Sequence, residues 1–163
     1  MRRPLTHPLP VLAVLALGLA ACSGGGGEDA PEPDPRVAYV EQATAVCDEA
    51  STDFSALTQP AAPADLGPFV NQTLAIAERA QTGLAELTPP EQDRADLESR
   101  VLDPFAALVD EGRAYAADVE AAGTDPAVLL PLLSQRPSVE GIDLAYLRNY
   151  GLESCADAIS QAG

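Results

Sequence analysis

Cysteine side chains carry the most distinctive chemistry in this sequence, which contains three of them, Cys22, Cys47 and Cys155. A thiol can form a disulfide, bind a soft metal ion, act as a nucleophile or carry a lipid. No two of these cysteines have the Cys-x-x-Cys spacing typical of redox pairs. The only histidine, His7, and the only methionine, Met1, both precede Cys22. Beyond Cys22 the sequence therefore excludes nearly all catalysis and metal binding that requires imidazole or thioether groups.

Carboxylates are the remaining candidates for catalysis. A pair of them can act as acid and base in glycoside hydrolysis if a cleft raises the pKa of one. Two predicted helices carry such groups: Asp48, Glu49, Asp53, Asp110, Glu111 and Asp118. An acidic chain supplies such pairs by chance, and it contains no Asp-x-Asp-x-Asp-Gly loop for calcium. We therefore predict no catalytic residue, no metal ligand and no cofactor.

The four tyrosines, Tyr39, Tyr115, Tyr146 and Tyr150, provide aromatic and phenolic groups. They can line a pocket, and a phenolate can ligate haem iron. We favour the simpler interpretation that they pack in the core of the domain.

The first residues have the layout of a secretory leader. A charged start, Arg2 and Arg3, precedes an apolar run over 11–21, which is too short for the roughly 20 residues of a transmembrane helix. The sequence Leu19-Ala20-Ala21-Cys22 resembles the lipobox of bacterial lipoproteins. This resemblance implies cleavage of a signal peptide over 1–21, lipid on Cys22, and anchoring to the outer face of the cell membrane. The alternative is an ordinary leader whose removal leaves a free thiol at Cys22.

A segment without core-forming residues follows the lipobox. Residues 22–36 contain four consecutive glycines and then prolines interleaved with acidic residues. Such a composition cannot pack a core and is typical of a flexible linker. We therefore predict a tether over 22–36 and one folded domain over 37–163.

The charge of the chain limits its partners. All 25 acidic residues follow Cys22, whereas two of the nine basic residues precede it, so the chain from Cys22 onward carries a formal charge of −18. It contains no lysine. Nucleic-acid binding requires a basic surface, and this chain is repelled by phosphates and by anionic lipid surfaces. We expect a neutral or basic partner, most simply another envelope protein.

Lipid on Cys22 leaves an even number of cysteines. Outside the cytoplasm thiols are not kept reduced, so Cys47 and Cys155 are predicted to form one structural disulfide. A redox-active pair is the alternative, which the wide separation of the two residues disfavours.

Apolar residues recur at spacings of three and four, as they do on one face of a helix. This pattern predicts long helices over 40–57, 65–88 and 91–123, a short helix over 127–135 and a last helical segment over 144–159. Asp65 is a candidate cap, and Gly123 a candidate end. Pro104 predicts a kink or a division into two pieces, of which we favour the kink. Gly151 permits either a close helix contact or, as we favour, a left-handed cap.

No segment shows the sustained alternation expected of a strand. We therefore predict an all-α fold, an antiparallel four-helix bundle with a short helical crossover. In that order the first and last helices are antiparallel neighbours, which lets Cys47 meet Cys155.

The chain resembles the small lipoproteins of high-GC Gram-positive bacteria. It shares their lipobox, their acidic tether, alanine-rich helices without lysine, and a closing Tyr150-Gly151-Leu152-Glu153-Ser154-Cys155. We expect a non-enzymatic, membrane-tethered module that binds another envelope protein. One alternative is a carrier of a small apolar ligand near the Leu129-Leu130 and Leu132-Leu133 pairs. Another is a glycan hydrolase that uses paired carboxylates.

Overall fold

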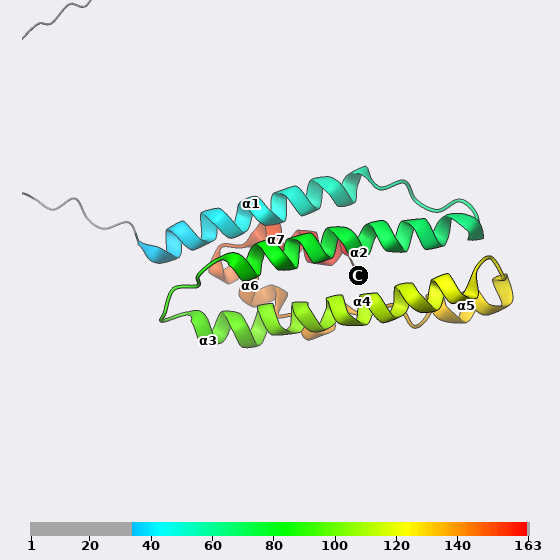
Figure 1. The fold of residues 1–163 in the computed structure, drawn as a ribbon. Coiled ribbons are helices and arrows are strands. Elements are labelled where there is room, and N and C mark those ends of the chain that lie inside the picture. The colour runs from blue at the N-terminus through cyan, green and yellow to red at the C-terminus, as the bar shows by residue number, and fades with distance from the viewer. Residues whose placement is uncertain (1–33, 163) are drawn as a thin grey trace, which may run out of the picture. The chain divides into compact units, whose positions relative to one another are not determined.

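The computed structural model describes residues 34–162, in which all regular structure is helical. The elements in chain order are α1 (Pro35–Ala56), α2 (Pro63–Glu86), α3 (Arg94–Leu97), the π-helical η1 (Glu98–Leu102), α4 (Asp103–Ala122), α5 (Pro126–Leu133), the 3-10 helix η2 (Val139–Gly141), α6 (Leu144–Tyr150) and α7 (Glu153–Ala162) (Figure 1). The all-α prediction is confirmed. The predicted leader and Cys22 lie outside the described residues.

Aspartate followed by proline starts two of the helices. The Asp34 carboxylate accepts a hydrogen bond from the backbone N–H of Arg36 at 2.9 Å, and Asp125 accepts one from Ala127 at 2.9 Å. Proline suits the first helical position because no carbonyl is available there for its missing N–H. Helix α1 therefore begins at Pro35, inside the segment 22–36 that was predicted to be a tether.

Helices α1, α2 and the continuous run α3–η1–α4 lie side by side (Figure 1). Residues late in α1 contact residues early in α2, and the reverse. Asp53 of α1 pairs with Arg79 of α2, whereas Val46, which comes earlier in α1, packs against Gly83, which comes later in α2. These two helices are therefore antiparallel. Asp65, a predicted cap, lies inside the first turn of α2, and the residue at the cap position is Ala62. The Asp65 carboxylate accepts a hydrogen bond from the backbone N–H of Ala62 at 2.9 Å.

Pro104 shapes the third long helix without breaking it. Proline has no N–H, and its ring excludes the carbonyl four residues earlier from an intrahelical bond. That carbonyl belongs to Arg100, and it accepts the backbone N–H of Asp143 at 3.0 Å instead. The turn immediately before Pro104 is the π-helical segment η1. The helix therefore stays continuous through a widened turn, and its free carbonyl fastens a distant part of the chain.

The chain returns along the bundle before its last two helices. After α5, residues 134–143 run back beside α4, so that α6 ends near the start of α1 and α7 follows along the middle of α1 (Figure 1). In two contacts that join α1 to α7, both residue numbers increase from one contact to the next: Cys47 pairs with Cys155, and Ser51 with Gln161. The contact of the Arg36 guanidinium with the Tyr150 carbonyl, at the end of α6, continues this order toward the start of α1. Helices α1 and α7 are therefore parallel. This corrects the predicted antiparallel arrangement, because the return is an irregular connection rather than a helix.

Gly151 ends α6 in the left-handed conformation, with φ of +97°. The backbone N–H of the next residue, Leu152, bonds to the carbonyl of Leu147 at 2.9 Å, and the Leu152 side chain is buried. This is the hydrogen-bond pattern of a glycine-capped helix end. The predicted cap is confirmed, and it divides the last helical segment into α6 and α7. Gly123, which follows α4 with φ of +60°, is likewise confirmed as a helix end.

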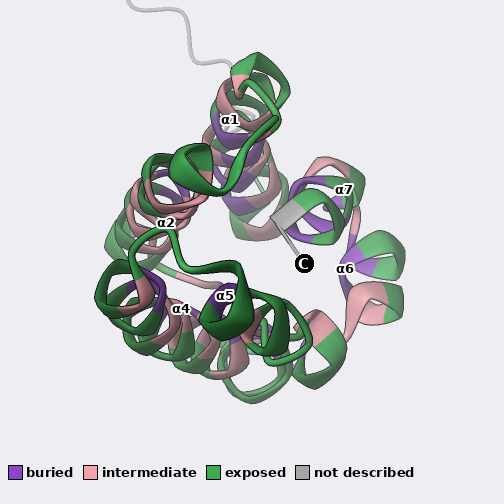
Figure 2. Ribbon diagram, turned by 90° about the vertical axis from the view of Figure 1, so that its right-hand side faces the viewer, coloured by how far each residue is buried: buried purple, intermediate pink, exposed green. Residues whose placement is uncertain are grey.

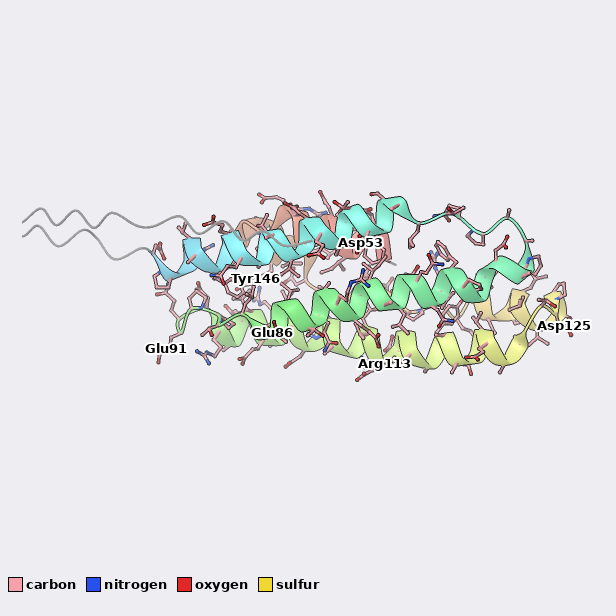
Figure 3. The ribbon with its side chains drawn as sticks, turned by 45° about the horizontal axis from the view of Figure 1, so that its top comes forward. Asp53, Glu86, Glu91, Arg113, Asp125 and Tyr146 are labelled. Atoms are coloured by element: carbon pink, nitrogen blue, oxygen red, sulfur yellow. A yellow bond between two sulfur atoms is a disulfide. The ribbon has the colours of Figure 1, made fainter. Side chains whose placement is uncertain are left out.

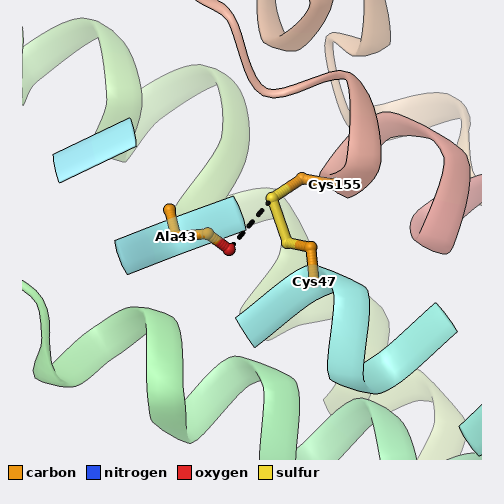
Figure 4. Close-up of a disulfide and its surroundings, with 3 residues drawn as sticks. All are labelled: Ala43, Cys47 and Cys155. Atoms are coloured by element: carbon orange, nitrogen blue, oxygen red, sulfur yellow. Dashed lines mark hydrogen bonds between the residues drawn. A yellow bond between two sulfur atoms is a disulfide. The ribbon is translucent and has the colours of Figure 1, made fainter. Parts of the chain in front are cut away.

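The disulfide between Cys47 and Cys155 joins α1 to α7, with the Cα atoms 4.8 Å apart (Figure 4). The Cys155 sulfur lies 3.6 Å from the Ala43 carbonyl oxygen. Since the sulfur carries no proton in the disulfide, this is a close contact rather than a true hydrogen bond. Small side chains permit the approach: Ala43 and Ala156 are fully buried at the same seam.

Replacing Gly151 should test its cap. An alanine in the left-handed region costs about 1–2 kcal/mol, so we expect Gly151→Ala to lower the free energy of unfolding by that amount in a denaturant titration. Gly151→Asn is the matched variant, because asparagine is larger but tolerates this conformation. It should be less destabilising than alanine. If Asn is the more damaging of the two, lack of space at the nearby Val40 is the cause and backbone strain is not.

Candidate functional site

Helix α5 presents apolar side chains to solvent. Its sequence, Pro-Ala-Val-Leu-Leu-Pro-Leu-Leu, contains no polar residue, so whichever face packs against the bundle, apolar groups remain outside. Leu129 is buried, with 4% of its surface exposed, whereas Val128, Leu130 and Leu133 are 47%, 66% and 45% exposed. Figure 2 shows most of this helix as exposed ribbon. We call these three side chains the α5 apolar surface.

Such a surface is costly to leave in water. Grouped apolar side chains on a soluble domain mark sites of contact with other molecules more often than isolated ones do. The other large apolar side chain that is strongly exposed among the described residues, Val37 at 62%, stands alone on α1. The α5 apolar surface is therefore the better candidate for a contact site.

The α5 apolar surface lies far from the point where the tether is predicted to join the domain. Helix α5 is at the opposite end of the bundle from the start of α1 at Pro35 (Figure 1). In Figure 3, the label of Asp125 marks the α5 end. The charged residues that flank α5 in sequence, Glu120, Asp125 and Arg136, are all exposed and sum to a negative charge. A partner with basic side chains around an apolar groove would complement this end.

Three tyrosines gather at the other end, around the start of α1. The Tyr146 and Tyr150 rings stack with centroids 5.7 Å apart, and Tyr39 meets Tyr150 edge to face at 6.3 Å. The Arg36 guanidinium lies 4.2 Å from the centre of the Tyr150 ring, within the range of a cation–π contact. The Tyr150 hydroxyl donates a hydrogen bond to Asp93 at 2.7 Å.

This tyrosine cluster has a structural explanation. It ties α1, α6 and the segment before α3 together, and Tyr39 and Tyr150 are buried, as core packing predicts. Burial raises the pKa of Tyr150 well above its usual range, and its hydrogen bond to the Asp93 carboxylate raises it further. The sequence prediction missed the cluster as a unit, although Tyr146 and Tyr150 are four residues apart, the spacing of neighbours on one helix face.

The predicted carboxylate candidates lie on the outside of the helices. Arg79 bonds Asp53 at 2.5 Å, and these two residues share a groove of about 180 Å³ with Glu49. Arg113 bonds both Asp110 and Glu78, the latter at 2.7 Å. Asp48, Glu111 and Asp118 are exposed.

Two further observations bear on the site. Among residues 34–162, no group of three or more carboxylate, imidazole or thiol side chains is placed to hold a metal ion. In the same part of the chain, no helix combines the length and apolar character that a membrane crossing requires.

No protein-family model, curated protein or solved structure matches this chain. A functional assignment must therefore come from the chain's own residues. The α5 apolar surface and the predicted lipid attachment at Cys22 are two such features.

The raised pKa of Tyr150 predicts how stability should vary at alkaline pH. The neutral phenol stabilises the fold fully below about pH 10, the ordinary tyrosine pKa, and this contribution is lost as the pH rises through the higher folded-state pKa. Phenolate absorbance can be titrated in the wild-type protein and in Tyr150→Phe, which lacks this phenol. The difference between the two curves reports on Tyr150 alone and should show it ionising above pH 10. Asp93→Asn should move that ionisation to lower pH. Ionisation of Tyr150 at the same pH in the folded and urea-unfolded chains would contradict the assignment.

Proposed function

We propose that this protein is an exported lipoprotein, held by lipid on Cys22 to the outer face of the cell membrane. We further propose that its helical domain is a non-enzymatic module that docks another envelope protein through the α5 apolar surface. The single observation that carries the docking proposal is the exposure of Val128, Leu130 and Leu133 together on one short helix. We also propose a finer description of the fold, namely a helical bundle in which α6 and α7 together occupy the place of a fourth helix.

The geometry of the domain suits this function. A tether that enters at Pro35 leaves α5 at the far end of the bundle, pointing away from the anchored end. The acidic surface keeps the domain soluble and disfavours contact with anionic headgroups. An apolar surface at the distal end, with negative charges beside it, then favours a protein partner with an apolar groove and a basic rim.

The two alternatives have less support. The carrier hypothesis places an apolar ligand between helices beside the α5 leucines, yet Leu130 and Leu133 are at the surface. A hollow in the core between α1, α2, α4 and α7 has a volume of about 20 Å³, room for about one water molecule. For the hydrolase hypothesis, the carboxylates Asp53 and Asp110 are bound by arginines at the surface.

Replacing the lipidated cysteine tests the address. Since no helix of the described domain can cross a membrane, the predicted lipid is the anchor available to it. Cys22→Ser should therefore move the protein from the membrane fraction to the soluble extracytoplasmic fraction. Mass analysis of the wild-type mature chain should find an acylated Cys22 at its N-terminus. An unmodified Cys22 thiol in the mature chain would refute the lipoprotein proposal.

Site-specific photo-crosslinking in intact cells tests the docking function. A photoreactive residue at Leu130 should give one discrete adduct with another protein, because docking buries this side chain. The same residue at Val37, an exposed apolar position at the other end, is the matched control and should give no such adduct. Leu133→Asp should abolish the Leu130 adduct without changing helix content, because it places a charge in the apolar contact. Equal adducts from both positions, or none from Leu130, would count against docking at α5.

A further inference from the structure

A groove of about 430 Å³ lies between the last turns of α2 and the α3–η1–α4 helix. Its floor is apolar: Leu84 and Phe105 are buried, and Leu102 is partly buried. Its volume is within the range of small-molecule sites, roughly 300–1,000 Å³. The groove is separate from the α5 apolar surface and from the tyrosine cluster.

The widened turn η1 forms one side of this groove. Glu98 and Leu102, the first and last residues of the π-helical segment, both line it. Single π-helical turns in otherwise α-helical segments occur frequently at functional sites. Here the turn is stabilised from outside, since the Arg100 carbonyl is held by Asp143.

Three charged side chains line the groove without partners of their own. Within residues 34–162, the side chains of Arg94, Glu98 and Asp103 make no ion pair and no hydrogen bond. Four other arginines do have a carboxylate partner: Arg79, Arg100, Arg113 and Arg148. Arg94 and Glu98 are four residues apart but do not pair. One guanidinium and two carboxylates thus face the same groove with their hydrogen-bonding groups available.

We propose that this groove binds a small zwitterion with an apolar body, of the class of hydrophobic dipeptides. The Arg94 guanidinium would receive the ligand's carboxylate through charge-assisted hydrogen bonds, and Glu98 and Asp103 would receive its ammonium group. The ligand's side chains would cover Leu84, Leu102 and Phe105. A ligand with only one charged end would satisfy one part of the lining and leave the other unpaired.

Calorimetric titration of the full-length protein with L-leucyl-L-leucine tests the proposal. We expect saturable binding of one molecule. Arg94→Gln and Glu98→Gln should each weaken it at least tenfold. Arg136→Gln is the matched control, since Arg136 is exposed and outside the groove, and it should leave binding unchanged. Ala85→Phe, on the exposed α2 side of the groove, should block the ligand by volume alone while every charge is kept.

Ligand analogues separate specific binding from simple attraction to an acidic protein. N-acetyl-leucyl-leucine lacks the ammonium group, and leucyl-leucine amide lacks the carboxylate, so each should bind at least tenfold more weakly than the dipeptide. No saturable binding of the dipeptide would overturn the proposal. The proposal also fails if the amide binds as well as the dipeptide, or if Arg136→Gln weakens binding as much as Arg94→Gln. None of these results depends on docking at α5.

Discussion

The covalent link between Cys47 and Cys155 is the constraint on which the rest of the bundle depends. It fixes α7, a helix of only ten residues, along the middle of α1 at a Cα separation of 4.8 Å. The residues at this seam are mostly small, so they bury little apolar area for each helix turn. A cross-link over 108 positions in sequence restricts the unfolded chain, and for loops of this length the stabilisation is at most about 4–5 kcal/mol. The bond thereby compensates for the small apolar area buried at this seam.

A second constraint acts at long range, and it comes from the backbone chemistry of one residue. Pro104 cannot occupy the hydrogen bond that Arg100 offers, and Asp143 takes it. This bond sets where the irregular return 134–143 ends and α6 begins. Together with the disulfide, it places the end of α6 against the start of α1 and places α7 along the middle of α1. Pro104 also borders the widened turn η1. This one proline therefore affects both the course of the return 134–143 and the shape of the groove.

Local patterns in the sequence predicted the local structure well. The structure confirms the three long helices, the disulfide and the caps at Gly123 and Gly151. These features were predictable because each depends on residues close together in sequence or on a single pairing of cysteines. The direction of α7 was not predictable from the same patterns, since it depends on whether residues 134–143 form a helix or an extended return. The groove at η1 was missed because its charged residues, Arg94, Glu98 and Asp103, look like an ordinary solvated helix face. The start of α1 was missed, although the pair Asp34-Pro35 that begins this helix is of the same type as the pair Asp125-Pro126 that begins α5.

The parallel arrangement of α1 and α7 has a mechanical consequence. If the domain is pulled at the start of α1 and at α5, force enters at one end of the bundle and leaves at the opposite end. The load then acts along the helix axes, as shear between neighbouring helices, and does not peel one helix away from the next. The disulfide shares the tension on α1 with α7 near the middle of the domain. This arrangement favours a domain that stays folded while it is pulled from both ends.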